Sequence, residues 1–197
     1  MRTEQDNMPT NQNILPEIIV FAGPNGSGKT TITKLARIIE PYINADDIKK
    51  TLNCSDIDAA VKAEELREYN LKCGNSFTFE TVFSTGRNLH LLQRAKANGY
   101  FIRCIYILTK DPSINVIRVK TREANGGHGV PKDKIISRYA KCLDLIPSLV
   151  KVCDIMHIYD NSKNPFRIFK KRKEQMFFWA NEFWSEDQIK RLVGVSL

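Results

Sequence analysis

The segment from Gly23 to Thr30 constrains this 197-residue chain most, because it reads Gly-Pro-Asn-Gly-Ser-Gly-Lys-Thr. It matches the pattern GxxxxGK[ST], in which glycines let the backbone curl until successive N–H groups point at one anion. The β-branched run from Ile18 to Phe21 precedes the segment, and a helical pattern follows it. The order strand, loop, helix predicts a phosphate-binding loop in an α/β fold.

Composition indicates one soluble globular domain. Hydrophobic residues make up 42% of the chain and charged residues 26%, close to the averages of soluble proteins. The stretch Met1 to Asn13 is polar, and no apolar run approaches the roughly 20 residues that span a bilayer. We therefore expect a cytoplasmic protein with a flexible segment 1–14, a single domain 15–197 and no membrane partner. The five cysteines form no CxxC pair and predict reduced core residues rather than disulfides or a zinc site.

Apolar runs alternate with helical patterns along the chain. This alternation predicts a three-layer P-loop NTPase of the nucleoside-kinase type, with a mostly parallel sheet flanked by helices and the site at the carboxyl ends of the strands. The predicted strands are 18–21, 42–44, 77–83, 100–108 and 154–159, with 166–169 and 176–179 as edge strands or a terminal hairpin. The predicted helices are 30–39, 55–71 with a Ser55/Asp58 cap, 89–97, 112–122, and one after Pro131 that Pro147 ends or bends.

The phosphate-loop motif predicts that the chain binds a nucleoside triphosphate. Lys29 can bridge the β- and γ-phosphates, and the Thr30 hydroxyl can ligate Mg²⁺. The cofactor is then Mg²⁺, and the phosphate donor is ATP or GTP. Asn161 follows the last apolar strand, where it could contact the nucleotide base, although a simple turn at Asp160-Asn161 is an open alternative. The expected nucleotide-binding residues are Gly23, Pro24, Asn25, Gly26, Ser27, Gly28, Lys29, Thr30, Thr31 and Asn161.

Three carboxylates are candidates for chemistry. Asp46 ends the second predicted strand, where it could accept the proton of an acceptor hydroxyl, and Asp47 is its rival. Either aspartate could instead cap the next helix. Glu80 lies inside the apolar strand 77–83, where a carboxylate must be paired, hydrogen-bonded or bound to Mg²⁺. A structural Arg or Lys is the alternative partner of Glu80.

A basic, glycine-rich loop joins two predicted helices and predicts a lid around residues 118–138. Cations on such a lid would stabilise the transferring phosphate and exclude water. The candidates are Arg118, Arg122 and Arg138, together with His128 in Gly126-Gly127-His128-Gly129. Solvated surface arginines and a loop-capping histidine are the alternatives.

Most of the net charge of +8 comes from residues 163–173, at the start of the basic C-terminal extension 163–197. Six cations and no acid lie between residues 163 and 173: Lys163, Arg167, Lys170, Lys171, Arg172 and Lys173. A solvated strand or turn is the simplest reading, and a phosphate-recruiting patch is the alternative.

Five motifs in order, over about residues 18–162, resemble the zeta toxin family of P-loop kinases, particularly its short chromosomal branch. They are Ala22 to Thr30, Asn44-Ala45-Asp46, Phe79-Glu80-Thr81, Gly126 to Pro131 with Arg138-Tyr139, and Tyr159 to Ser162. The resemblance implies a toxin that phosphorylates the 3′-hydroxyl of UDP-N-acetylated aminosugars and an antitoxin protein that blocks its nucleotide site. It also implies that Asp46 is the base, Glu80 a substrate or metal contact, and Arg118 or Arg122 a γ-phosphate clamp.

Two positions depart from the family pattern. Val82 stands where the resembling toxins carry a threonine that contacts substrate, and His128 stands where they carry a second arginine. We predict a kinase that transfers the γ-phosphate to a hydroxyl of a small molecule, with Lys29, Asp46, Glu80, Arg118, Arg122 and His128 as catalytic residues. Nucleic acid is not the favoured partner, but the alternative is a nucleic-acid-associated NTPase that uses the basic patch. A nucleotide-binding protein without turnover is a third reading.

Overall fold

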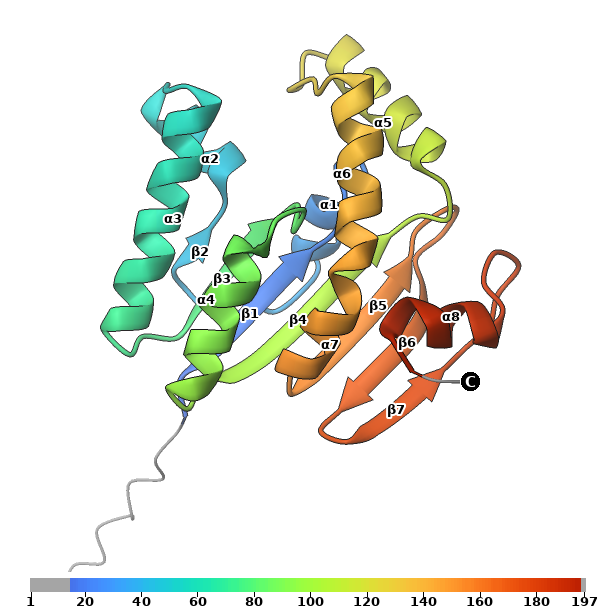
Figure 1. The fold of residues 1–197 in the computed structure, drawn as a ribbon. Coiled ribbons are helices and arrows are strands. Elements are labelled where there is room, and N and C mark those ends of the chain that lie inside the picture. Colours follow the sequence, from blue (N-terminus) through green and yellow to red (C-terminus); the bar gives the residue numbers. More distant parts are fainter. Residues whose placement is uncertain (1–14, 196–197) are drawn as a thin grey trace, which may run out of the picture.

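A seven-stranded sheet runs through the molecule in the order β2-β3-β1-β4-β5-β6-β7 (Figure 1). The structure is a computed structural model that describes residues 15–195, so the expected flexible segment 1–14 lies outside the described residues. Strands β1 to β5 are parallel, and β6 and β7 are antiparallel. The strands are β1 (Glu17–Ala22), β2 (Tyr42–Ile43), β3 (Phe77–Thr81), β4 (Phe101–Leu108), β5 (Ile155–Asp160), β6 (Phe166–Arg172) and β7 (Gln175–Phe178).

Helices flank both faces of the sheet, which confirms the predicted fold class. They are α1 (Lys29–Thr33), α2 (Ala45–Leu52), α3 (Asp56–Lys72), α4 (Gly86–Ala97), α5 (Pro112–Ala124), α6 (Lys132–Asp144), α7 (Ile146–Val152) and α8 (Glu186–Val193). None of these helices is long and apolar enough to cross a bilayer.

The two faces of the sheet are covered unequally. Alternate residues of one strand point to opposite faces, so β1 contributes Ile18 and Val20 to one face and Ile19 and Phe21 to the other. On the first face, residues of α3, α4, α7 and α8 form the main core with the strands. On the second face, the core is a small cluster in which α1 and the chain after it pack on β1 and β4. The second face is therefore the thinner layer.

The first helix is much shorter than predicted. The pattern 30–39 predicts ten residues, but α1 ends at Thr33 after five. Three of its five residues are threonines, and the Thr33 hydroxyl donates to the Lys29 carbonyl oxygen at 3.0 Å, a back-bond that weakens helices. The chain continues in tight turns toward Pro41.

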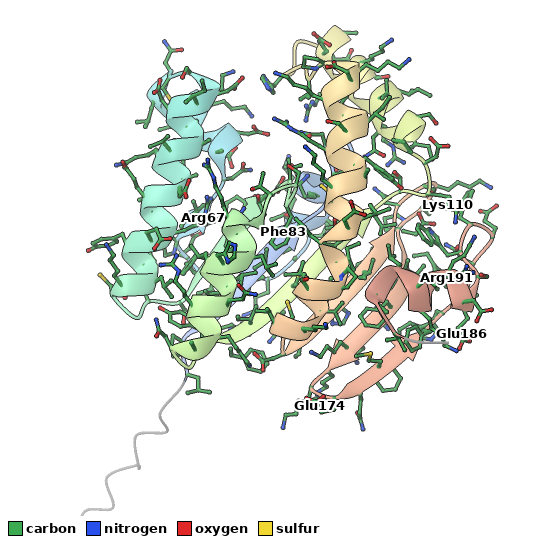
Figure 2. The ribbon with its side chains drawn as sticks, viewed as in Figure 1. Arg67, Phe83, Lys110, Glu174, Glu186 and Arg191 are labelled. Atoms are coloured by element: carbon green, nitrogen blue, oxygen red, sulfur yellow. The ribbon has the colours of Figure 1, made fainter. Side chains whose placement is uncertain are left out.

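Two helices were not predicted from the sequence. Helix α2 follows β2 directly, with Asn44 as its N-cap. Helix α8 begins with a capping box formed by Ser185 and Gln188. The remaining elements lie within a few residues of their predicted bounds, including the Ser55 cap of α3 and the C-terminal hairpin β6–β7, whose turn carries Glu174 (Figure 2). Pro147 marks a break: α6 ends at Asp144 and α7 begins at Ile146.

No disulfide occurs within residues 15–195, as predicted. Cys104, Cys142 and Cys153 are buried, but Cys73 is exposed, so the prediction that the cysteines are core residues is wrong there. Cys73 is the C-cap of α3, at the end of an element rather than in its packed face.

Candidate active site

The phosphate loop joins β1 to α1 and lies against the ends of β4 and β5. Gly23 has φ = 145°, and a Cβ atom there would lie 1.9 Å from the carbonyl oxygen of Ile107. Gly28 has φ = 95°, and a Cβ atom there would lie 2.4 Å from Nδ2 of Asn161. Both positions therefore need glycine for conformation and for space.

Two asparagine amides hold the loop in shape. Asn161, directly after β5, donates from Nδ2 to the Ser27 carbonyl oxygen at 2.8 Å. Asn115 of α5 donates from Nδ2 to the Asn25 carbonyl oxygen at 2.6 Å. The structure thus gives Asn161 a role in supporting the loop, and its contact with a base stays a prediction. Sequence reasoning missed Asn115, whose one signal was a lone amide in an otherwise apolar helix face.

The loop encloses a polar atom that has no protein partner. Ser27 is fully buried, and its Oγ makes no hydrogen bond with the described residues. A buried polar group without a partner costs about 1–3 kcal/mol, so such groups usually meet a ligand or water. A hydroxyl can donate to a phosphate oxygen. The donor set of the loop therefore fits a bound phosphate.

Lys29 lies inside the loop. Its Nζ donates to the carbonyl oxygens of Gly23 at 2.9 Å and Pro24 at 3.0 Å. Burial lowers the pKa of Lys29, while the charge of Glu80 is the largest influence that raises it and Asp46 contributes in the same direction. An ammonium group held this way is placed for an anion that enters the loop.

Glu80 is the centre of a cluster of hydroxyl groups. Its carboxylate accepts hydrogen bonds from Thr30 at 3.0 Å, Thr33 at 3.3 Å and Tyr42 at 3.0 Å. Burial and then the charge of Glu80 raise the pKa of Tyr42, so the phenol keeps its proton and donates it. No salt bridge to Glu80 occurs within residues 15–195, so the alternative of a structural Arg or Lys partner is wrong. Sequence reasoning missed Thr33 and Tyr42.

The oxygen atoms around Thr30 are of the type that Mg²⁺ prefers. The Thr30 hydroxyl is exposed at the mouth of the loop and lies beside the Glu80 carboxylate. Mg²⁺ is usually held by one or two protein oxygens together with substrate phosphates. No group of three His, Cys, Asp or Glu side chains gathers elsewhere in the described chain as a competing metal site. The arrangement fits an ion that arrives with a nucleotide.

Asp46 lies in the first turn of α2, not at the end of β2. Asn44 caps this helix, because its Oδ1 accepts from the backbone N–H of Asp46 at 3.0 Å. The capping alternative for Asp46 and Asp47 is therefore wrong. Both carboxylates are exposed. Asp46 differs from Asp47 because its negative charge acts to raise the pKa of Lys29. Thr31 is an exposed residue of α1.

The predicted lid, residues 118–138, comprises the second half of α5, the first half of α6 and the loop between them, and this part projects beyond the carboxyl ends of the strands (Figure 1). Arg118 donates from Nη2 to the Ser162 carbonyl oxygen at 3.3 Å, and its Nη1 is buried without a partner in the described residues. Arg122 donates to the His128 carbonyl oxygen at 2.6 Å, and its positive charge acts to lower the pKa of Lys29. Arg122 is therefore the cation of the predicted lid whose charge acts on Lys29.

The side chain of His128 approaches α3, on the opposite side of the site from α5 and α6. Its Nε2 lies 3.7 Å from a carboxylate oxygen of Asp56, the first residue of α3, and both side chains are exposed. Arg138 is half-buried. Burial raises the pKa of the Cys142 thiol to about 12, although the positive charges of Lys29 and Arg138 act to lower it. The thiol of Cys142 donates to the Val82 carbonyl oxygen at 2.8 Å. The structure thus brings Arg138 to the side of the site near Val82.

The region around Asp160 is built as a turn, as the alternative reading had it. Its carboxylate accepts from the backbone N–H of Ser162 at 3.1 Å and from Asn181 at 2.9 Å. Because Asp160 is buried and fully engaged, it fixes the segment that carries Asn161.

Comparisons with known proteins agree with this architecture. The chain is 32% identical to an uncharacterized protein of Haemophilus influenzae over 127 residues, which are 61% of this chain and 91% of that protein. Its fold is similar to a structure from the PezAT chromosomal toxin–antitoxin system of Streptococcus pneumoniae, with a TM-score of 0.59 and 18% identity over 93% of this chain and 80% of that chain.

A second similar fold is that of the complex AvrRxo1-ORF1:ORF2 with ATP. The TM-score is 0.65 and the identity 14%, and the match covers 90% of this chain but 63% of that longer chain. These likenesses concern the fold. The family model for zeta toxin matches residues 2–174, nearly the whole sequence, and the chain therefore belongs to the zeta toxin family of P-loop kinases.

Proposed function

We propose that this protein transfers the γ-phosphate of ATP or GTP to a hydroxyl group of a small molecule. The observation that carries the proposal is the position of Glu80, whose carboxylate accepts from Thr30 of the phosphate loop and from Tyr42 beside the Asp46 helix. One group thus joins the loop that would hold the donor to the segment that would hold the acceptor.

Each residue has a distinct role in this proposal. Loop N–H groups, the Ser27 hydroxyl and the Lys29 ammonium bind the phosphates. Thr30, with Glu80 beside it, would hold Mg²⁺ together with the nucleotide, and the ion would offset negative charge on the transferring group. Asp46 takes the proton from the acceptor hydroxyl as its oxygen attacks phosphorus, and the bond to the leaving diphosphate breaks. Arg122 stabilises the charge that develops, and Arg118, His128 and Arg138 help the lid to exclude water.

One feature favours Asp46 over Asp47 as the base. The negative charge of Asp46 acts to raise the pKa of Lys29. Asp46 is exposed, as Asp47 is, so an acceptor can reach it. A base needs both access and nearness to the transferred group.

The acceptor class follows from family resemblance, which favours a UDP-N-acetylated aminosugar and a role as a toxin. Val82, where the resembling toxins carry threonine, supplies no side-chain hydroxyl, so the contacts with an acceptor differ here. We also propose an antitoxin protein as a partner, in line with the toxin–antitoxin system named for the PezAT structure. Cytoplasmic location belongs to the same proposal.

The test is incubation of the purified full-length chain with γ-labelled ATP or GTP and Mg²⁺, against a panel of UDP-sugars and a metabolite extract. Lys29→Ala and Asp46→Asn should each abolish transfer, whereas Asp47→Asn, one residue away on the same helix, should retain it. A labelled nucleotide sugar identifies the acceptor class. Transfer that survives Asp46→Asn contradicts the assigned base, and label found only as free phosphate contradicts a kinase.

The second candidate function is a nucleic-acid-stimulated NTPase, which would require the six cations of 163–173 to act as one patch. The structure separates them. Lys163 forms a 2.7 Å ion pair with Glu182, and Lys171 is buried with its Nζ on the Val150 carbonyl oxygen. A continuous basic strip along this segment is therefore absent from the described residues. Stimulation of phosphate release by RNA or DNA would nevertheless favour the NTPase over the kinase.

A further inference from the structure

One half of the thinner side of the sheet has no helix packed on it among the described residues. Met156 and Ile158 of β5 point into the main core with α7 and α8, so His157 and Tyr159 point to the opposite face. Figure 1 shows α7 and α8 on the near side of β5, β6 and β7. On the far side, the cluster under α1 involves β1 and β4 and does not extend to β5.

Strand register places six side chains together on that far side. His157 pairs with Lys170, and Tyr159 pairs with Arg167 across β5 and β6. Lys170 pairs in turn with Phe177 across β6 and β7, and Trp179 stacks on Phe177. Directly opposed residues share one face of a sheet. The open face is defined by His157, Tyr159, Arg167, Lys170, Phe177 and Trp179.

The aromatic rings of the open face are arranged in two parallel pairs. The His157 and Tyr159 centroids lie 6.3 Å apart with an interplanar angle of 12°, and those of Phe177 and Trp179 lie 6.1 Å apart at 16°. Phe177 is 42% exposed and the other three rings are half-buried, so their surfaces are accessible. Flat rings of this kind suit stacking on flat, aromatic ligands.

The cations of the open face lie on the rings. The Arg167 guanidinium lies 4.8 Å from the Trp179 centroid, and the Lys170 ammonium lies 5.8 Å from that of Phe177. Neither cation forms a salt bridge within residues 15–195, and the Nε of Arg167 is buried without a partner. Glu17 of the neighbouring strand β1 is paired with Arg103 at 2.8 Å. The face is therefore positive and lacks its own counter-charge.

The pKa of His157 is consistent with the positive charge of the open face. Burial, followed by the charges of Arg167, Lys170 and Arg103, lowers the pKa of His157 to about 4. The ring is thus neutral near pH 7, and it stacks without adding a further positive charge. An anion bound on the face would reverse part of this effect and raise the pKa.

We propose that the open face binds single-stranded nucleic acid, with bases stacked on the two aromatic pairs and phosphates on Arg167 and Lys170. Open sheet surfaces that combine aromatic rings with cations are typical of single-strand recognition, because every base has a flat face and every nucleotide a charge. The surface is separate from the phosphate loop, so binding there does not depend on the proposed kinase activity.

The test is fluorescence anisotropy of labelled U15 and dT15 with the full-length chain at several salt concentrations, in excess Mg-ATP to occupy the phosphate loop. We expect affinity to fall with salt, with a slope of about 0.7 per phosphate contacted. Arg167→Gln with Lys170→Gln should lower affinity at least tenfold and flatten the slope. Tyr159→Ala should lower affinity about tenfold and leave the slope unchanged, because the cations of the face lie on Trp179 and Phe177 and this change removes stacking alone.

The matched control is Lys163→Gln, since Lys163 lies in the same basic segment but is paired with Glu182. It should bind within twofold of the unchanged protein. Thermal unfolding checks that each variant folds, and phosphate transfer by the open-face variants should stay unchanged, which separates this proposal from the kinase. Nuclear magnetic resonance titration of His157 should show its pKa rise when U15 is bound.

Three outcomes would overturn the proposal. Equal affinity for double-stranded and single-stranded nucleic acid would show that the protein attracts phosphates in general and that bases do not stack on the open face. A glutamate-rich peptide that binds more tightly than U15 would identify an acidic protein segment as the occupant. Loss of binding in Lys163→Gln as large as in the double variant would show that the open face is not the site.

Discussion

The phosphate loop and the lid are both glycine-rich and both face the proposed nucleotide, yet they are built in opposite ways. The loop is mostly buried, is held by Asn115 and Asn161, and leaves no room for a Cβ atom at Gly23. The lid loop is exposed, and a Cβ atom at Gly126 would meet nothing within 4 Å. The phosphate loop is thus shaped before a ligand arrives, whereas the tip of the proposed lid at Gly126 has no packed neighbour that fixes its position.

The largest expected effect tests the rigid side of this comparison. Gly23→Ala places a methyl group 1.9 Å from the Ile107 carbonyl oxygen, so the loop must move away from β4. Because displacements of about 1 Å can cost about 100-fold in rate, we expect phosphate transfer to fall by at least that factor. Calorimetry should show weakened uptake of Mg-ATP or Mg-GTP.

Gly126→Ala in the lid is the matched control. Its φ is also positive, at 79°, so alanine is disfavoured there as well, but a Cβ atom meets no neighbour. Transfer should stay within a few-fold of the unchanged protein. If the two variants are equally impaired, then strain rather than space explains the loss, and the contrast between loop and lid fails.

An intermediate effect is expected where the loop meets the acceptor side. Glu80→Gln removes the carboxylate charge that is the largest influence raising the pKa of Lys29, and it replaces one acceptor oxygen by an amide donor. Groups that support a metal or its ligands typically change activity by about 10–100-fold, and we expect a loss in that range with a higher Mg²⁺ requirement.

Tyr42→Phe is the companion variant, because it deletes one of the three hydroxyl donors and keeps the charge. One lost hydrogen bond to a charged group should reduce activity by roughly tenfold. Steady-state rates over a Mg²⁺ series measure both variants. A Glu80→Gln protein with an unchanged Mg²⁺ dependence would remove Glu80 from the metal site.

The smallest effect is expected in the lid. His128→Gln removes an exposed contact to Asp56 at 3.7 Å, and exposed pairs of this kind contribute little. We expect less than about a fivefold change in KM and no change in thermal stability. Asp56→Asn should behave alike, since it removes the other partner. A loss of 100-fold in kcat would instead assign His128 to the reacting groups.

Much of the fold could be predicted because the alternation of strand and helix patterns along the chain is typical of a parallel sheet with helices on its faces. The run 100–108 forms the central strand β4, which is buried on one face and half-buried on the other at Phe101, Arg103 and Ile105. The phosphate loop lies between a strand and a helix, as its motif requires. The length of α1 could not be predicted, since the back-bond of Thr33 competes with the helix within one turn. Helix α2 was missed because its first turn reads as the acidic end of a strand.

The site was predictable where a motif carries the chemistry and not where distant residues support it. Glu80 was identified by the cost of a carboxylate in an apolar strand, but its partners Thr33 and Tyr42 come from 47 and 38 positions away. Asn115 reaches the loop across 90 positions. The basic segment 163–173 is visible in the sequence, but its division between the two faces depends on the irregular register between β5 and β6.

Strand β2 is two residues long and lies at the margin of the sheet, and its tyrosine is tied to the centre by a single phenolic hydrogen bond to Glu80. The phosphate loop is held by Asn115 and Asn161 and not by β2. Substitutions at that margin would therefore change the contacts of the proposed acceptor more than the shape of the loop.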